Sequence, residues 1–420
     1  MLDRRVLLKS GALAMLSFGA GPSFLRRAAL ATGTSPRRRT LVTLFQRGAM
    51  DALAAVPPTG GSELAALRPS LAMSAARSAG AGAVLDLGVG FGFHPALAPW
   101  LPFWREGRLA VVHCVGSPDP TRSHFDAQDY MESGTPGRKG TASGWLNRVC
   151  GTLGHDATPF RAVATTSALP RSLSGPEAAL AIPDLKAFGV RLRGAGGAAA
   201  VAGAGFESLY DEASQQLLRD AGRESFDALR LLAERGVANS RPASGASYPA
   251  SPLGSSLREV AQLVKADVGL EVAFVESGGW DTHVQQGTAQ GTFARRADDL
   301  ARAVAAFWTD LGARQADVVL MTMTEFGRTV RENGSGGTDH GHGSCLFVLG
   351  DRVDGGKVHG RFPGLDLDRL HEGRDLPVTT DFRAVFAGVA AAHLGSRQAS
   401  VIFPGWSGEP VALLRPEPAV

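Results

Sequence analysis

The chain has 420 residues, of which 44% are hydrophobic and 20% charged, so it can bury one large core or two modest ones. This length and composition exclude a peptide and a disordered tail. Its 43 basic and 40 acidic side chains give a formal net charge of +3, and residues 1–31 hold five of the basic side chains and one of the acidic ones. The rest of the chain is close to neutral, so charge predicts no nucleic-acid partner and no anionic membrane surface.

Residues 1–31 have the organisation of a bacterial export signal. A basic start is followed by an apolar run at 11–20, which is too short to span a bilayer, and by a small-residue site at 29–31. The start, residues 3–9, resembles the twin-arginine signature, which directs folded proteins across the bacterial inner membrane. We expect cleavage and a periplasmic or secreted location, with the twin-arginine export machinery as a partner. An uncleaved N-terminal anchor is the alternative.

The sequence beyond the signal predicts neither a membrane span nor a disulfide framework. No other segment has about eighteen uninterrupted apolar residues, so we expect no stable membrane insertion after cleavage. Cys114, Cys150 and Cys345 are an odd number of cysteines and form no CxxC pair, which argues against disulfides and against a zinc ribbon. We expect three buried thiols.

Apolar segments rich in Val and Leu alternate with helical patterns along the chain. The expected strands are residues 40–45, 109–115, 270–275, 318–323 and 345–349. The expected helices are residues 123–132, 144–151, 207–234, 257–265, 293–311 and 381–394. This alternation predicts an α/β three-layer sandwich, with a mostly parallel central sheet and helices on both faces. In such sheets, binding and catalytic side chains collect at the carboxyl ends of the strands.

We expect one domain, residues 38–420, that contains one helical insertion. The insertion covers residues 193–252, because a Gly/Ala-rich segment at 193–205 and a Ser/Pro-rich segment at 240–252 interrupt the alternation. A segment of this size is expected to form a cap or a rim on the domain rather than a domain of its own.

The first two strands each lead into a polar segment. Asp51 follows the first strand, where a carboxylate can bind a metal ion or cap the next helix. Ser123 begins the helix after the second strand, where free N–H groups and the helix dipole favour an anionic group, so its hydroxyl is a candidate nucleophile. Ser123 also precedes Asp126 by three residues, as in a helix capping box, and the two roles use the same position.

The segment after the strand at 270–275 contains the strongest candidate cluster of metal ligands. Glu276, Asp281 and His283 lie within eight residues, and Gly278 and Gly279 allow the backbone to turn sharply. Two carboxylates and an imidazole are suitable donors for a divalent ion. This segment therefore predicts a metal site.

A second histidine-containing segment follows the strand at 318–323. Glu325 and Arg328 come directly after that strand, and the glycine-rich loop 336–343 contains Asp339, His340 and His342. The two imidazoles can bind one ion together, or one can bind the metal while the other holds the substrate. The Arg328 guanidinium can bind an oxyanion or form a surface salt bridge.

Four segments of the chain are distinctive enough to be compared with known families. They are GSPDPTRSHFDAQDYMESG (116–134), GGWDTH (278–283), TEFGRT (324–329) and GGTDHGHG (336–343). Together they resemble the bacterial exported family called domain of unknown function 1501, which is grouped with the alkaline-phosphatase-like superfamily that includes the sulfatases. The resemblance covers nearly the whole chain after the signal and implies the alkaline-phosphatase-like fold.

The resemblance also implies roles from the superfamily's two-metal pattern. Asp51 stands where the first-strand metal aspartate is expected. Ser123 is near the nucleophile that caps a helix, with Thr121 and Ser117 as alternatives.

The segment VESGGWDTH resembles the alkaline phosphatase stretch V-E-G-G-x-I-D. This makes Glu276 similar to a magnesium ligand and Asp281 similar to a zinc ligand. In the superfamily a histidine usually lies four residues after this aspartate, whereas His283 lies two residues after Asp281.

The chain departs from the superfamily pattern again after the strand at 318–323. Glu325-Phe326 stands where Asp-His is common, and the loop with Asp339, His340 and His342 is a possible source of the missing imidazole. A site that keeps its carboxylates and loses an imidazole favours a harder ion such as Mg²⁺, Mn²⁺ or Ca²⁺ over Zn²⁺, or is catalytically inactive. The sequence leaves the identity of the divalent ion open.

The clusters and the resemblance together predict an exported metal-dependent hydrolase of phosphate or sulfate esters, whose substrate is a small molecule or a polymer. Ser123 would attack the ester, Arg328 would hold the oxyanion, and one or two divalent ions would activate the hydroxyl. The candidate ligands are Asp51, Glu276, Asp281, His283, Glu325, Asp339, His340 and His342. The alternative is a non-catalytic exported binding protein that keeps the same fold.

Replacing both Arg4 and Arg5 with Lys tests the export signal. The receptor for this signal recognises the guanidinium pair and not charge alone, so we expect the double variant to accumulate in the cytoplasm. Cell fractionation and immunoblotting measure the distribution. Undiminished export of the double variant would remove the assignment.

Overall fold

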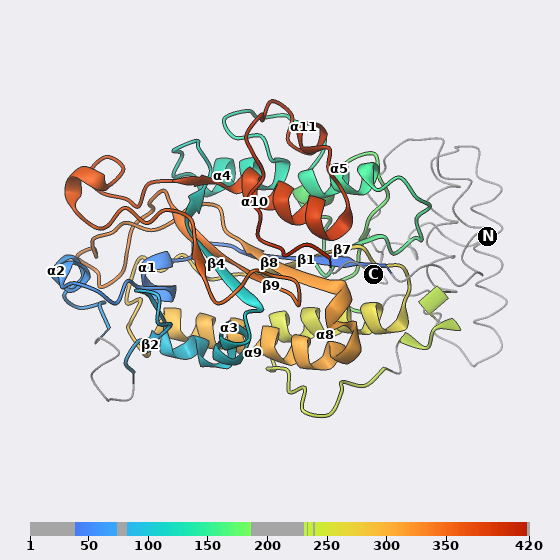
Figure 1. Ribbon diagram of the computed structural model, residues 1–420, viewed down its shortest axis with the longest axis horizontal. Helices are drawn as coiled ribbons and strands as arrows, with labels where there is room; N and C mark the ends of the chain where they lie inside the picture. Colours follow the sequence, from blue (N-terminus) through green and yellow to red (C-terminus); the bar gives the residue numbers. More distant parts are fainter. Residues whose placement is uncertain (1–37, 74–81, 186–230, 233, 238–239, 418–420) are drawn as a thin grey trace, which may run out of the picture.

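The computed structural model describes residues 38–73, 82–185, 231–232, 234–237 and 240–417 (Figure 1). The predicted signal at 1–31 lies outside the described residues, as does most of the predicted insertion at 193–252 with its helix at 207–234. Among the described residues, no helix has both the length and the apolar character that crossing a bilayer requires.

A mixed sheet forms the middle layer of the domain. In spatial order its strands are β10 (Val358–His359), β4 (Leu109–Gly116), β9 (Ser344–Leu349), β8 (Val318–Met323), β1 (Thr40–Gln46), β7 (Val272–Ser277), β5 (Ala162–Ala164) and β6 (Leu180–Ala181), and β11 (Thr380–Asp381) also pairs with β4. All pairs are parallel except the two that involve β9. A separate small sheet joins β2 (Leu85–Asp86) to β3 (Gly92–Phe93).

Helices cover both faces of this sheet (Figure 1). One face carries α4 (His124–Ser133), α5 (Trp145–Thr152), α10 (Phe382–Val389) and α11 (Ala399–Ile402), and the other carries α3 (Leu101–Arg105), α8 (Pro252–Ala266) and α9 (Thr292–Leu311). The short helices α1 (Ala52–Ala55) and α2 (Glu63–Leu67) follow β1. The predicted α/β class with a mostly parallel sheet is confirmed.

The five predicted strands are all present, because each is an apolar run long enough to be buried on both faces. Each observed strand begins and ends within two residues of its predicted bounds. The short strands β5, β6, β10 and β11 were not predicted, since two or three residues carry no periodicity. The predicted helix 257–265 is longer in the structure, because Ser251 caps α8 by accepting a hydrogen bond from the Gly254 N–H at 3.0 Å.

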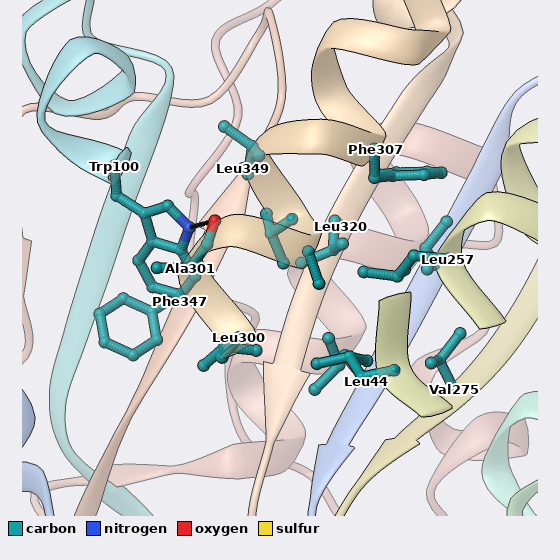
Figure 2. Close-up of a cluster of buried hydrophobic side chains, with 14 of the residues drawn as sticks. Leu44, Trp100, Leu257, Val275, Leu300, Ala301, Phe307, Leu320, Phe347 and Leu349 are labelled. Atoms are coloured by element: carbon teal, nitrogen blue, oxygen red, sulfur yellow. Dashed lines mark hydrogen bonds between the residues drawn. The ribbon is translucent and has the colours of Figure 1, made fainter. Parts of the chain in front are cut away.

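Apolar side chains fill the space between the sheet and α8 and α9 (Figure 2). Trp100 lies against Phe347 of β9 with ring centroids 4.8 Å apart, and its indole N–H donates to the Ala301 carbonyl of α9 at 3.2 Å. A second core on the other face contains Trp145 and Phe386, whose rings stack. All three cysteines are free and buried, as predicted.

The direction of the strands gathers the site loops at one edge of the sheet. β1, β4, β7 and β8 end at this edge, and β9 begins there, since Ser344 pairs with Val115 near the end of β4. The segment 324–343 therefore leaves the sheet and returns to it at the same edge. The polar clusters predicted after these strands all lie in loops at this edge.

Phe347→Ala tests the packing between β9 and Trp100. Because Phe347 is 2% exposed, we expect the free energy of unfolding to fall by about 3–5 kcal/mol. Phe125→Ala is the matched control: Phe125 is 91% exposed, so its truncation should change stability by no more than about 0.5 kcal/mol. Urea unfolding followed by circular dichroism measures both, and equal losses would contradict this account of the core.

Candidate metal centre

Three side chains from three different loops form a potential metal-binding group. His124 Nε2 or Nδ1, a carboxylate oxygen of Asp281 and a ring nitrogen of His340 lie within 4.8 Å of one another, the one such group found within the described ranges. His124 is the first residue of α4, Asp281 follows β7, and His340 lies in the loop between β8 and β9. His124 and His340, which are more than 200 positions apart in the sequence, are thus brought together with Asp281 at the edge of the sheet.

His283 extends this group. Its Nε2 lies 3.0 Å from Asp281 Oδ1 and 2.9 Å from His340 Nε2. The loop that carries Asp281 and His283 packs closely on the end of β1, because a Cβ at Gly48 would lie 2.5 Å from the Asp281 nitrogen. Gly48 also has a φ of +115°, so a larger residue is excluded by both space and conformation.

Each of the three imidazoles is held at Nδ1 by a hydrogen-bond acceptor. His124 Nδ1 donates to Glu325 Oε1 at 2.9 Å, and His283 Nδ1 donates to Asp339 Oδ1 at 3.1 Å. His340 Nδ1 donates to the Arg122 carbonyl oxygen at 2.8 Å. Since carboxylate and carbonyl oxygens only accept, Nδ1 carries a proton, and each ring in its neutral form presents a lone pair at Nε2.

Within the described residues, the groups facing these Nε2 atoms are the Asp281 carboxylate, which only accepts, and a neighbouring imidazole. The buried Nε2 of His124 has no hydrogen-bond partner among the described residues and lies 3.5 Å from Asp281 Oδ2. The Nε2 atoms of His283 and His340 face each other, although two lone pairs repel. A divalent cation satisfies three imidazoles and a carboxylate together, and Zn²⁺ and Mn²⁺ are suited to such donors. The residues therefore fit a metal ion.

Arg328 orients the carboxylate of this group. Its buried guanidinium donates from Nη1 to Asp281 Oδ1 at 2.6 Å and from Nε to Thr338 Oγ1 at 3.2 Å. Burial opposes ionisation of Asp281, but the Arg328 guanidinium outweighs it and lowers the pKa of Asp281. The guanidinium that was predicted to hold an oxyanion thus lies behind the Asp281 carboxylate.

Glu325 supports His124 from a fully buried position. It accepts hydrogen bonds from the Gly48 N–H at 2.8 Å and from Gln128 Nε2 at 2.9 Å, in addition to that from His124. Burial opposes ionisation of Glu325, but the hydrogen bonds from His124 and Gln128 lower its pKa. The hydrogen bond to Glu325 raises the pKa of His124, whereas burial lowers the pKa of His340. Glu325 and Asp339, both predicted as ligands, instead hydrogen-bond to the candidate ligands His124 and His283.

The other predicted ligands make different contacts. Asp51 is 1% exposed, and Arg68 donates to both of its oxygens, at 2.7 and 3.1 Å. Burial opposes ionisation of Asp51, but Arg68 lowers its pKa. Glu276 accepts a hydrogen bond from Arg47 Nε at 2.7 Å, and His342 Nε2 donates to the Ser117 carbonyl oxygen at 2.9 Å.

Ser123 is the N-cap residue of α4, and its side chain makes no capping hydrogen bond. The alternative capping-box interpretation is wrong, because Asp126 pairs with Lys139 at 2.6 Å instead. Of the three candidate nucleophiles, Ser123 is exposed, Thr121 is half-buried and Ser117 is buried. The Ser123 hydroxyl is therefore the most accessible one, and it directly precedes the candidate ligand His124 in the sequence.

The sequence prediction missed His124. This residue follows the predicted nucleophile directly, and the segment was already explained by a hydroxyl at the start of a helix. The available signal was positional: the segment follows a strand that ends at the same edge as the strands before Asp281 and His340. Every imidazole just past such a strand is a candidate ligand.

Replacing the ligands tests the metal centre. We expect at least one tightly held divalent ion in the wild-type protein, and an occupancy reduced at least about tenfold by Asp281→Asn or His340→Ala, because each change removes one donor. Elemental analysis after exhaustive dialysis measures the occupancy. Affinity should also fall as pH decreases, since protons compete for the Nε2 atoms.

His155→Ala is the matched control for these variants. His155 is a half-exposed histidine that pairs with Glu271, just before β7 begins and thus at the opposite edge of the sheet, so its loss should leave metal occupancy unchanged. Wild-type protein without bound ion, and without a thermal shift on addition of Zn²⁺, Mn²⁺, Mg²⁺ or Ca²⁺, would contradict the centre.

Comparison with known families identifies a family whose model matches most of the chain. The family model described as a protein of unknown function (DUF1501) matches residues 62–402. These residues include His124, Asp281, His283 and His340, whereas Asp51 precedes them. A search among curated proteins gives no match. Since the matched segment spans most of the sequence, the chain belongs to the DUF1501 family.

Proposed function

We propose that this protein is an exported metal-dependent hydrolase of phosphate or sulfate esters with an alkaline-phosphatase-like fold. The observation that carries the proposal is the set of three imidazoles whose Nδ1 atoms are all engaged, so that their Nε2 lone pairs converge on the Asp281 carboxylate. Such outer hydrogen bonds are the usual support of histidine ligands in metalloenzymes.

The exposure of the site favours catalysis over a purely structural ion. Structural metal sites are closed by protein ligands, whereas catalytic sites keep a position open to water and substrate. Here the side chains of Asp281 and His283 are 42% and 37% exposed, and Ser123, which directly precedes His124 in the sequence, is also exposed. A substrate can therefore reach the centre from solvent.

The charges around the site favour an anionic reacting group. The first turn of α4 presents free N–H groups next to Ser123 and His124, and the positive end of the helix dipole lies there. Arg328 offsets the negative charge of Asp281. A bound divalent ion would add positive charge, polarise the ester and lower the pKa of the attacking hydroxyl.

Ser123 supplies the nucleophile in this proposal. Its Oγ loses a proton to water and forms a bond to phosphorus or sulfur, while the bond to the ester oxygen breaks and the alcohol leaves with a proton. Water then hydrolyses the seryl ester, which releases phosphate or sulfate and restores Ser123. The net reaction consumes one water for each ester.

Ser123→Ala tests this function. We expect the metal-loaded wild-type protein to hydrolyse an aryl phosphate or an aryl sulfate, and the variant to lose at least about 10³-fold in kcat, because the covalent route is removed. Initial rates are measured from neutral to alkaline pH. Metal content and melting temperature should stay close to wild type, since the Ser123 side chain caps nothing.

Ser255→Ala provides the matched control. Ser255 is an exposed serine on α8, which covers the opposite face of the sheet from α4 (Figure 1), so this change should leave the rate unaltered. If the loaded wild-type protein hydrolyses neither ester, the proposal is replaced by a non-catalytic exported binding protein. If activity survives Ser123→Ala and Thr121→Ala abolishes it, the nucleophile is Thr121.

A further inference from the structure

A chain of buried hydrogen bonds runs behind the candidate metal centre. It begins at the ion pair between Arg68 and Asp51, both at most 2% exposed. Gln286 Nε2 donates to Asp51 Oδ2 at 2.7 Å, and Gln286 itself is fully buried. Asp51 is thus hydrogen-bonded to Gln286, a neutral side chain that has no role in the candidate site described above.

The chain continues from Gln286 to the metal ligand. Thr338 Oγ1 donates to Gln286 Oε1 at 2.9 Å, and Arg328 Nε donates to Thr338 Oγ1 at 3.2 Å. Arg328 Nη1 then donates to Asp281 Oδ1 at 2.6 Å. An unbroken path therefore joins Asp51, which does not touch the group of histidines, to Asp281, which is part of it.

The chemistry at the two ends fixes the direction of every hydrogen bond between them. A guanidinium only donates, so the Thr338 hydroxyl accepts from Arg328 and its own proton goes to Gln286. A carboxylate only accepts, so the Gln286 amide turns its nitrogen to Asp51 and its oxygen to Thr338. The amide and the hydroxyl each have one permitted orientation.

We propose that Gln286 and Thr338 are positioning residues that hold Arg328, and through it the Asp281 carboxylate, in the orientation that binds the metal ion. This inference rests on the proposed function for its metal centre. It gives Asp51 a role other than ligand: its negative charge orients the Gln286 amide from the far end of the path.

Thr338→Val tests the orientation of the Arg328 guanidinium separately from its charge. Valine has nearly the shape of threonine, and Thr338 is fully buried, so the change removes one hydroxyl and leaves the guanidinium charge of Arg328 in place. The main-chain carbonyl of residue 338, which also accepts from Arg328 Nη2, is retained. Any effect on the metal therefore comes from lost orientation.

We expect Thr338→Val to weaken Zn²⁺ binding by about 10- to 100-fold, the usual effect of losing an outer-shell partner. Competition with a chromophoric chelator measures the dissociation constant. The absorption spectrum of the Co²⁺-loaded protein provides a second readout, and we expect its d–d bands to shift because the coordinating carboxylate is no longer fixed.

Two further variants make this test specific. Thr338→Ser keeps the hydroxyl and should restore wild-type affinity and spectrum. Thr43→Val removes an equally buried hydroxyl, which donates to the Ala273 carbonyl within the sheet, and should cost stability without changing either readout.

The outcomes distinguish this inference from the proposed function. If folded Thr338→Val binds Zn²⁺ within twofold of wild type with an unchanged Co²⁺ spectrum, the positioning role is wrong and the metal centre stands. If Thr43→Val weakens binding as much as Thr338→Val, the effect is one of general stability and the inference also fails. Wild-type protein that binds no metal overturns both proposals, whereas wild-type protein that binds metal but hydrolyses no ester overturns only the proposed function.

Discussion

A neutral imidazole carries one ring proton, and the candidate site depends on where three such protons lie. Glu325, Asp339 and the Arg122 carbonyl each draw the proton of one ring to Nδ1. The opposite nitrogens then have only lone pairs to offer, and they face one another across the Asp281 carboxylate. This arrangement is unfavourable without a cation or extra protons, which is why the site is best understood as a place prepared for a positive ion.

The site is supported by buried charged side chains, and each has a partner. Asp51 lies against Arg68, Arg328 lies against the exposed Asp281, and Glu325 accepts a hydrogen bond from His124. Removing one partner of a buried pair leaves a desolvated charge and typically costs about 3–5 kcal/mol. The protein therefore maintains the geometry of the site through interactions that contribute little net stability but are costly to break, so the loops are held in one arrangement.

Sequence patterns predicted the sheet and part of the site for different physical reasons. Strands such as β1 and β8 are continuous apolar runs, and this property is visible without knowledge of the neighbours. Asp281, His283 and His340 were found because polar groups after such strands collect at one edge. The partners of the other predicted ligands were not predictable from spacing. Asp51 pairs with Arg68 and Glu276 with Arg47 because of which loops meet in space, and the sequence around these arginines does not indicate the pairing.

The reversed direction of β9 has an evolutionary consequence. Parallel strands need a crossover connection, whereas the segment between β8 and the antiparallel β9 turns back at the same edge. Within this segment, an antiparallel bridge pairs Arg328 with His340, so the residues between them form a loop with a closed base. The length and sequence of such a loop can change as related proteins diverge, while the sheet, His124 and Asp281 stay in place. Relatives with different substrates are therefore expected to differ first between residues 331 and 335, whereas Thr338 and Asp339, which support the site, are expected to be kept.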